Sequence, residues 1–183
     1  MMPIGPLMVE HRLIERMIGL LEERSGEAVR CGEIDPVFID RAVDFIRTYA
    51  DRTHHGKEEG ILFKDLAIKD LSEEDRRTMQ ELVDEHVYAR STVGELVGAN
   101  ERYRRGDIAA LAIILDKIAA LVSLYPGHIA KEDKVFFPAA IKYLDRSEQD
   151  AMLQAMWEFD RGMIHEKYRS VVEQLERREV SNE

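Results

Sequence analysis

The chain has 183 residues, a formal net charge of −10 and one cysteine, Cys31. This length suits a single domain with a sizeable core. The acidic balance argues against a nucleic-acid binder, which normally presents a basic face. A lone cysteine cannot form an internal disulfide, and the first residues lack the basic start and apolar core of a secretory leader. We therefore expect one cytoplasmic domain, residues 1–183, with no nucleic-acid partner.

Helical periodicity begins near the first residues of the chain. The first predicted helix covers about residues 6–30, where apolar residues recur at spacings of three and four. Asp35 before Pro36 predicts the start of a second helix, which ends near residue 68. Ser72 with Asp75 predicts the start of a third, which ends before Gly106.

The fourth predicted helix contains the most apolar stretch of the sequence. We expect Asp107 to cap it and the helix to continue to about residue 144. Its apolar run, "IAALAIILDKIAALVSLY", is interrupted by Asp116 and Lys117. The interruption favours a buried core helix over a membrane-spanning one.

A fifth helix is predicted at about residues 148–177, with Ser147 and Asp150 at its start. Nothing in the sequence has the alternating period of a strand. Long helices joined by short connections favour an all-α fold. We expect an up-down-up-down antiparallel four-helix bundle at about 6–144, with an additional C-terminal fifth helix.

The sequence contains an internal repeat. "HHGKEEGILFKDL" from residue 54 aligns without gaps with "HIAKEDKVFFPAA" from residue 128. Glu-His pairs precede each segment, at residues 10–11 and 85–86. The spacing between the two histidines of each half is 43 residues in one and 42 in the other. Two helix pairs, each with a His and then a His-x-x-x-Glu, predict a pseudo-two-fold bundle.

The repeated histidines and glutamates form a candidate metal site. The expected ligands are His11, His54, Glu58, His86, His128 and Glu132. Burying such groups together is costly unless a metal compensates them. The set is too rich for one tetrahedral zinc and suits two metal ions bridged by carboxylates. We expect the first two histidines to serve one ion, the last two to serve the other, and the two glutamates to bridge.

The roles of two further histidines, His55 and His165, remain open. Ala50 and Ile46 lie one and two turns before His54, whereas polar residues precede His55. His54 is therefore expected to point inward, and His55 either reaches the metal from the edge or lies beside the ligands or at the surface. His165 is either a surface or helix-packing residue, or an extra ligand if the fifth helix folds over the bundle.

The pattern His, His-x-x-x-Glu, His, His-x-x-x-Glu, with the trailing "ILF" and "VFFP", resembles the hemerythrin-like, or HHE cation-binding, proteins over roughly residues 6–144. The resemblance implies an up-down four-helix bundle around a non-haem di-iron centre. It makes iron the expected metal, although manganese or zinc could load according to availability.

The chain departs from the oxygen-carrying members at two places. Those proteins have a second histidine one turn after the third-helix histidine, where this chain has Arg90. They also use an aspartate five residues after the last histidine. Asp133 has that spacing here, although the repeat favours Glu132. The resemblance is therefore nearer to microbial members and to domains that sense iron or oxygen, in which a residue beside the second-helix histidine sometimes ligates.

The favoured function is a metal-binding protein that binds, senses or reacts with O₂, NO or peroxide, or responds to iron. The alternatives are a di-iron oxidoreductase or peroxidase, and a metal-stabilised interaction module whose fifth helix forms a homodimer. No acid or base beside an organic-substrate channel is identifiable, so no catalytic residue is assigned. A membrane partner is not expected.

Overall fold

The computed structural model describes the backbone of residues 2–180 and the side chains of residues 2–163. Every element in this range is helical. In chain order they are α1 (Ile4–Cys31), α2 (Pro36–Phe45), η1 (Ile46–His55), η2 (Glu58–Phe63), α3 (Lys64–Leu66), α4 (Glu73–Arg104), α5 (Ala110–Lys131), η3 (Glu132–Phe136), α6 (Phe137–Ala140), η4 (Ile141–Tyr143) and α7 (Arg146–Val180). The segments η1, η2 and η3 are π-helical and η4 is a 3₁₀ turn, so α2 to α3 and α5 to η4 form two long helical runs.

Two of the predicted helix starts are confirmed. The side chain of Asp35 accepts a hydrogen bond from the backbone N–H of Val37 at 2.8 Å. Ser72 Oγ accepts one from the N–H of Asp75 at 3.1 Å. Each bond satisfies a backbone donor that the first helical turn leaves without a partner.

The third connection differs from the expected one. Gly106 does follow the end of α4, with a left-handed φ of 96° that favours glycine. Asp107, however, does not cap the next helix, because its carboxylate accepts hydrogen bonds from Arg102 at 2.7 and 2.9 Å. α5 begins later, at Ala110, without a side-chain cap.

The start of α7 also lies earlier than the expected Ser147–Asp150 cap. Asp145 Oδ1 accepts a hydrogen bond from the Glu148 N–H at 2.9 Å, and Glu148 Oε2 accepts one from the Asp145 N–H at 2.9 Å. This reciprocal capping box starts the helix at residue 146. The sequence prediction chose the wrong cap because both pairs have the same three-residue spacing.

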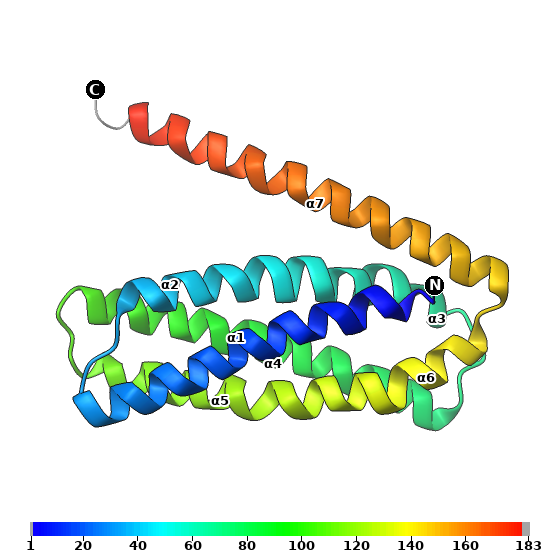
Figure 1. The fold of residues 1–183 in the computed structure, drawn as a ribbon, viewed down its shortest axis with the longest axis horizontal. Helices are drawn as coiled ribbons and strands as arrows, with labels where there is room; N and C mark the ends of the chain where they lie inside the picture. The colour runs from blue at the N-terminus through cyan, green and yellow to red at the C-terminus, as the bar shows by residue number, and fades with distance from the viewer. Residues whose placement is uncertain (1, 181–183) are drawn as a thin grey trace.

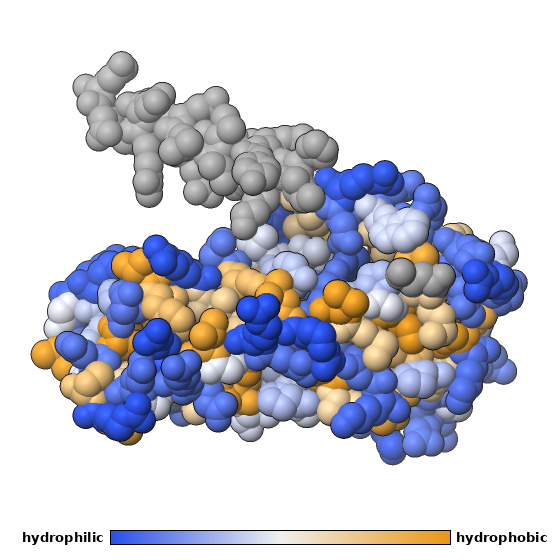
Figure 2. All heavy atoms as spheres, in the orientation of Figure 1, coloured by the Kyte–Doolittle hydropathy of each residue, from blue (hydrophilic) through white to orange (hydrophobic). Residues whose placement is uncertain are grey.

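The helices form an all-helical bundle. In Figure 1, α1, the run from α2 to α3, α4 and the run from α5 to η4 lie lengthwise beside one another, and α7 leaves one end at an angle. α5 packs along both α1 and α4. The face seen in Figure 2 carries hydrophilic residues interspersed with hydrophobic ones.

The core consists of two apolar clusters. One contains, among others, Ile14, Ile18, Ala50, Val93, Leu121 and Tyr125. The other contains Leu7, Leu62, Phe63, Leu82, Phe136 and Met156 among its members. On α1, His11 stands between Leu7 of one cluster and Ile14 of the other, so a layer of buried histidines and glutamates separates the two clusters.

The run Ala110–Tyr143 is long and apolar enough to cross a membrane by length and composition, with a hydropathy of 1.6. The core helix of a soluble protein passes the same test. Here the run carries His128 and Glu132 into the interior of the bundle, where both are buried. A membrane span would place these polar groups in the lipid at a large cost.

The first half of α7 lies against the bundle. Met152 and Met156 are buried in the second cluster. One turn farther along, the ring of Phe159 lies over Gly56, between η1 and η2. Asp160 Oδ1 forms an ion pair with Lys57 Nζ at 2.7 Å. These contacts fix α7 over the helical run that carries the repeated His and Glu residues.

The contact at Gly56 leads to a stability prediction. A Cβ atom added there would lie 2.9 Å from Phe159 Cζ, closer than real Cβ contacts allow. We expect Gly56→Ala to lower the free energy of unfolding by about 1–3 kcal/mol, because the phenyl ring must shift and α7 loses packing. Urea unfolding followed by circular dichroism measures the change.

Gly60 provides the matched control, since it lies in the next helical segment and a Cβ there would meet nothing within 4 Å. Gly60→Ala should stabilise the protein by about 0.4–1 kcal/mol through the reduced entropy of the unfolded chain. Equal stabilisation by both substitutions would show that Phe159 does not restrict the Gly56 position.

Candidate metal centre

Several of the candidate ligands lie in π-helical segments, whereas His11 and His86 lie in the α-helices α1 and α4. His54 and His55 end η1, Glu58 begins η2, and Glu132 begins η3. π-helical turns are rare and often mark functional sites. Their hydrogen bonds span five residues instead of four, so each turn holds more residues and neighbouring side chains diverge by a smaller angle. This geometry brings adjacent side chains such as His54 and His55 toward the same interior.

The first group of ligand atoms comes from His11, His54, Glu58 and Glu132. One atom from each of the four residues lies within 4.8 Å of all the others. All four side chains are buried, at 0–1% exposure. Three separate helical runs contribute to this group, so only the folded bundle assembles it.

The second group contains His55, His86 and His128, again with one atom from each within 4.8 Å. The ring of His55 stacks on that of His86 with centroids 3.8 Å apart and an interplanar angle of 11°. Asp51 Oδ1 lies 3.4 Å from His55 Nδ1. Three buried imidazoles are thus collected beside the first group.

Glu58 reaches both groups. Its Oε1 lies 3.3 Å from His54 Nε2, and its Oε2 lies 3.5 Å from His86 Nε2. The two oxygens of this carboxylate therefore face histidines of different groups. A bridging carboxylate requires this geometry.

Glu132 repeats this arrangement from the other half of the chain. Its Oε2 lies 3.1 Å from His11 Nε2, and its Oε1 lies 3.3 Å from His128 Nε2. The two glutamates thus span the same pair of positions from opposite sides.

The donor atoms of the centre are unpaired, and this tests whether a metal fits. Among the described side chains, nine of the buried atoms without a hydrogen-bond partner belong to it: Nε2 of His11, His54, His86 and His128, Nδ1 of His55, and both oxygens of Glu58 and Glu132. Such groups are costly to bury unsatisfied. Imidazole nitrogens and carboxylate oxygens facing one another suit divalent transition metals. The residues present therefore fit a pair of metal ions.

A carboxylate orients each of the four repeated histidines through its other ring nitrogen. Nδ1 of His54 lies 2.9 Å from a carboxylate oxygen of Glu10. The same atom lies 2.7 Å from a carboxylate oxygen in each of the other three pairs, which are His86 with Glu59, His128 with Glu85, and His11 with Asp133. A carboxylate on Nδ1 fixes the tautomer that leaves Nε2 free to bind metal. All four Nε2 atoms are the unpaired ones described above.

Each orienting carboxylate also contacts a cation. Lys57 bonds Glu10, Arg90 bonds Glu59 at 2.7 Å, Lys131 bonds Glu85 at 2.6 Å, and Arg12 bonds Asp133. The two equivalent lysines differ in exposure, since the Lys57 side chain is 0% exposed and that of Lys131 is 27% exposed. The difference arises because Asp160 of α7 caps Lys57.

The pKa values reflect this crowding of charge. Burial alone would lower the pKa of His54, but Glu58 and Glu10 raise it to about 9. Burial and the charge on His54 lower the pKa of His11 to about 4. Burial and the nearby Glu58 carboxylate raise the pKa of Glu132 well above its usual value. Without metal, two carboxylates this close are not both readily ionised.

The structure brings together the six residues predicted from the repeat. The sequence left several roles open for His55, and its 2% exposure and its place in the second group argue against the surface role. Asp133 lies outside both groups, bonded to His11 and Arg12. The side chain of His165 lies outside the described residues.

The sequence analysis did not identify three of the orienting carboxylates or the buried lysine beside them. These residues are Glu10, Glu59, Glu85 and Lys57. A signal was present. Glu10 and Glu85 begin the two Glu-His pairs, and Glu59 aligns with Asp133 in the repeat. Lys57 likewise aligns with Lys131. Repeated charged residues beside each ligand indicate the partners of those ligands.

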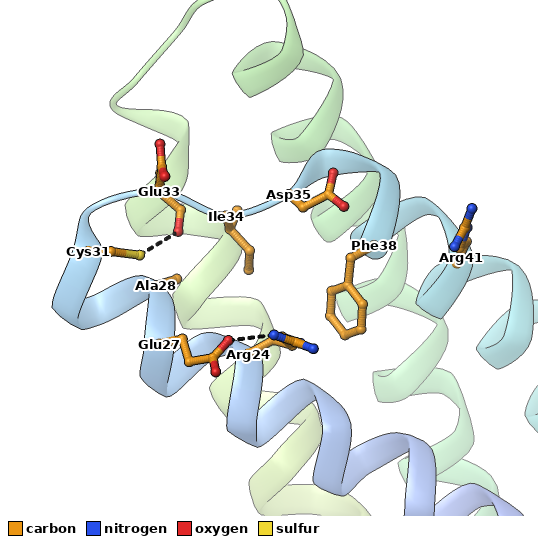
Figure 3. A pocket seen from close by; sticks show the side chains of 9 residues that line it. All are labelled: Arg24, Glu27, Ala28, Cys31, Glu33, Ile34, Asp35, Phe38 and Arg41. Carbon is orange, nitrogen blue, oxygen red and sulfur yellow. Dashed lines mark hydrogen bonds and ion pairs between the residues drawn. The ribbon is translucent and has the colours of Figure 1, made fainter.

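A separate cavity of about 640 Å³ lies where α1 meets α2 (Figure 3). It is lined by charged side chains, including Arg24, Glu27 and Arg41, and by the exposed Cys31, whose Sγ donates to the Glu33 carbonyl. None of the metal-centre residues lines it. The Cys31 region therefore has no part in the centre.

Comparison with known proteins identifies the family. The model of the hemerythrin HHE cation-binding domain matches residues 2–140 and, a second time, residues 77–182. The second match starts 75 residues after the first, which is the spacing between Glu10 and Glu85. Searches of curated proteins and of solved structures gave no match. The first match covers most of the chain and all six repeated ligands, so the chain belongs to the hemerythrin HHE cation-binding domain family.

Proposed function

We propose that the chain is a non-haem di-iron protein. The observation that carries the proposal is the placement of Glu58 and Glu132, each with one oxygen toward each group of histidines. Protein sites with two metal ions hold them roughly 3.5–4 Å apart, and bridging carboxylates suit this separation. The first ion would be held by His11 and His54, the second by His86 and His128.

His55 supplies a third histidine to the second ion in this proposal. It stacks on His86, and burial lowers its pKa well below the usual value, so the imidazole is neutral, as a ligand must be. Arg90 stands where oxygen carriers have a histidine. It supports His55 indirectly, through Asp51. Its Nε donates to Asp51 at 2.7 Å, and Asp51 faces His55 Nδ1. The two ions then have unequal histidine ligation.

Iron is the proposed metal because of the family and the mixed imidazole and carboxylate donors. Manganese or zinc would bind similar donors, since raw affinity does not select among these ions. Bound iron supplies redox chemistry and open coordination positions for a small molecule. We propose that this molecule is O₂, NO or peroxide, and that the protein binds, senses or reacts with it.

The domain organisation, the localisation and the partners of the chain are also proposals. Residues 1–183 form one domain, with an up-down-up-down antiparallel four-helix bundle and the fifth helix α7 added at its C-terminal end. Hemerythrin-like domains are generally soluble, which supports a cytoplasmic protein without a membrane or nucleic-acid partner. We also propose that two copies of the chain form a homodimer through α7.

Metal analysis with optical spectroscopy tests the proposal. Aerobically purified protein should contain about two iron ions per chain. Its near-ultraviolet and visible spectrum should change on reduction and change again on exposure to O₂ or NO. A reversible response indicates binding or sensing, and an irreversible one indicates reaction. Protein that cannot be loaded with two transition-metal ions, under reducing conditions and with excess metal, would contradict the proposal.

A further inference from the structure

Tyr125 places a buried ring beside His128 of the metal centre, and the hydroxyl group of this ring is unpaired. It lies one turn before His128 on α5, and the two rings have centroids 6.4 Å apart at an angle of 80°. The side chain is buried, at 2% exposure. Among the described side chains, its hydroxyl is the only buried one without a hydrogen-bond partner.

Packing does not account for this hydroxyl. The ring of Tyr125 belongs to the first apolar cluster with Leu121 and Ile129. A phenylalanine would fill that space without burying a polar group. Buried hydroxyl groups normally have a partner, and an exception calls for an explanation such as an additional ligand.

The pKa of Tyr125 reflects its burial among charged groups. Burial raises the pKa of Tyr125, and the carboxylates of Asp51, Glu132 and Glu58 raise it further. These carboxylates belong to the ligands or support them. A phenol supplies a single O–H donor.

The internal repeat shows that this position is specialised. With the spacing that relates His54 to His128, Tyr125 corresponds to Asp51 and Ile129 corresponds to His55. Asp51 is fully engaged, because it accepts a bond from Arg90 and faces His55. The second half thus has a free hydroxyl donor and an apolar residue where the first has a bonded carboxylate and an imidazole.

A groove of about 370 Å³ gives this side of the centre contact with the exterior. It runs between α1 and α5 and is lined by Tyr125, Ile129, Ile18, Gly19 and Asp133, among others. Tyr125 lines this groove, and its ring also lies beside that of His128. Arg12, Glu15 and Lys134 line it as well, so a small molecule entering there would meet charged as well as apolar groups.

We propose that the Tyr125 hydroxyl donates a hydrogen bond to a small anion or diatomic ligand held at the metal centre. The inference rests on the proposed function, since the ligand needs the metal ions. A donor fixed in a buried site favours ligands whose outer atom carries negative charge. Tyr125 is thus a residue that positions and selects the ligand.

Azide binding to the iron-loaded, full-length protein tests this role. The Tyr125→Phe variant keeps the ring and removes the hydroxyl. We expect its iron content to match that of the unchanged protein and its azide affinity, from optical titration, to fall about tenfold or more, as for loss of a hydrogen bond to a charged group. Its thermal stability without azide should not fall, because an unpaired buried hydroxyl is removed.

Tyr88→Phe is the matched control. Tyr88 lies on α4 two residues after His86 but is 52% exposed, so its hydroxyl is outside the centre. This variant should bind azide as the unchanged protein does. Equal azide affinity in Tyr125→Phe would overturn the inference, as would the absence of azide binding to unchanged protein that holds its iron.

A third contrary outcome is spectroscopic. A visible band that is present without azide and lost in Tyr125→Phe would show that the oxygen binds iron directly, which contradicts a donor role. Failure of the unchanged protein to hold iron is distinguishable from all of these, because the iron content reports it before any azide is added. That result would contradict the proposed function and this inference with it.

Discussion

The Glu132→Ala variant is expected to lose most of its metal. Glu132 faces His11 with one oxygen and His128 with the other, so its removal takes a ligand from both ions. Metal content should fall from about two ions per chain to fewer than one. Because bound metal stabilises only the folded chain, added iron should no longer raise the unfolding temperature. Glu58→Ala should behave in the same way, since Glu58 has the equivalent position.

The Glu132→Gln variant separates ligation from packing. It keeps the size of the side chain but removes the charge, and burial beside Glu58 already makes that charge unfavourable without metal. The metal-free variant should therefore be at least as stable as the metal-free unchanged protein, yet bind little metal. Glu15→Ala, an exposed change one turn after His11, should leave metal content intact. Full retention of two ions by both Glu58→Ala and Glu132→Ala would rule out bridging carboxylates.

The His54→Ala variant is expected to combine loss of metal with a large loss of stability. His54 contacts Glu58 at 3.3 Å and Glu10 at 2.9 Å. Its pKa of about 9 means that it carries the compensating positive charge in metal-free protein at neutral pH. Removing it leaves the buried Glu58 without this charge, while Glu10 keeps only Lys57. Breaking such a buried pair costs about 3–5 kcal/mol, which urea unfolding of the metal-free protein would measure.

His55→Ala is the informative comparison, because the two histidines are neighbours in the chain and both are buried. His55 belongs only to the group with His86 and His128, so the first group remains complete. We expect this variant to retain one tightly bound ion and to lose part of the second. Its metal-free stability should fall less than that of His54→Ala, since burial keeps His55 neutral. Two fully bound ions in His55→Ala would show that His55 only packs against His86.

The centre could largely be predicted from the sequence, because its residues occur twice. A single His-x-x-x-Glu is common in an acidic chain, but the aligned segments from His54 and His128 narrowed the set to four histidines and two glutamates. The helix boundaries were predictable where a cap was unambiguous, as at Asp35 and Ser72. At Ser147 two overlapping caps had the same spacing, and the wrong one was chosen.

The position of His55 was not predictable from helical periodicity. The facing argument that separated His55 from His54 assumed 3.6 residues per turn, whereas residues 46–55 are π-helical. The burial of Lys57 was equally hidden. A lysine is rarely buried unless paired, and its partner Asp160 lies more than a hundred residues later in the chain, on α7. Contacts between distant segments leave little trace in local patterns.

The contacts that orient the histidines also determine how the two halves of the chain depend on each other. Two of them lie within a half, His54 with Glu10 and His128 with Glu85. The other two cross between halves in reciprocal fashion, since the first half supplies a carboxylate to His86 and the second supplies one to His11. The connection at residues 67–72 carries none of them. The halves are therefore related as the two subunits of a symmetric dimer are, each completing the other's site.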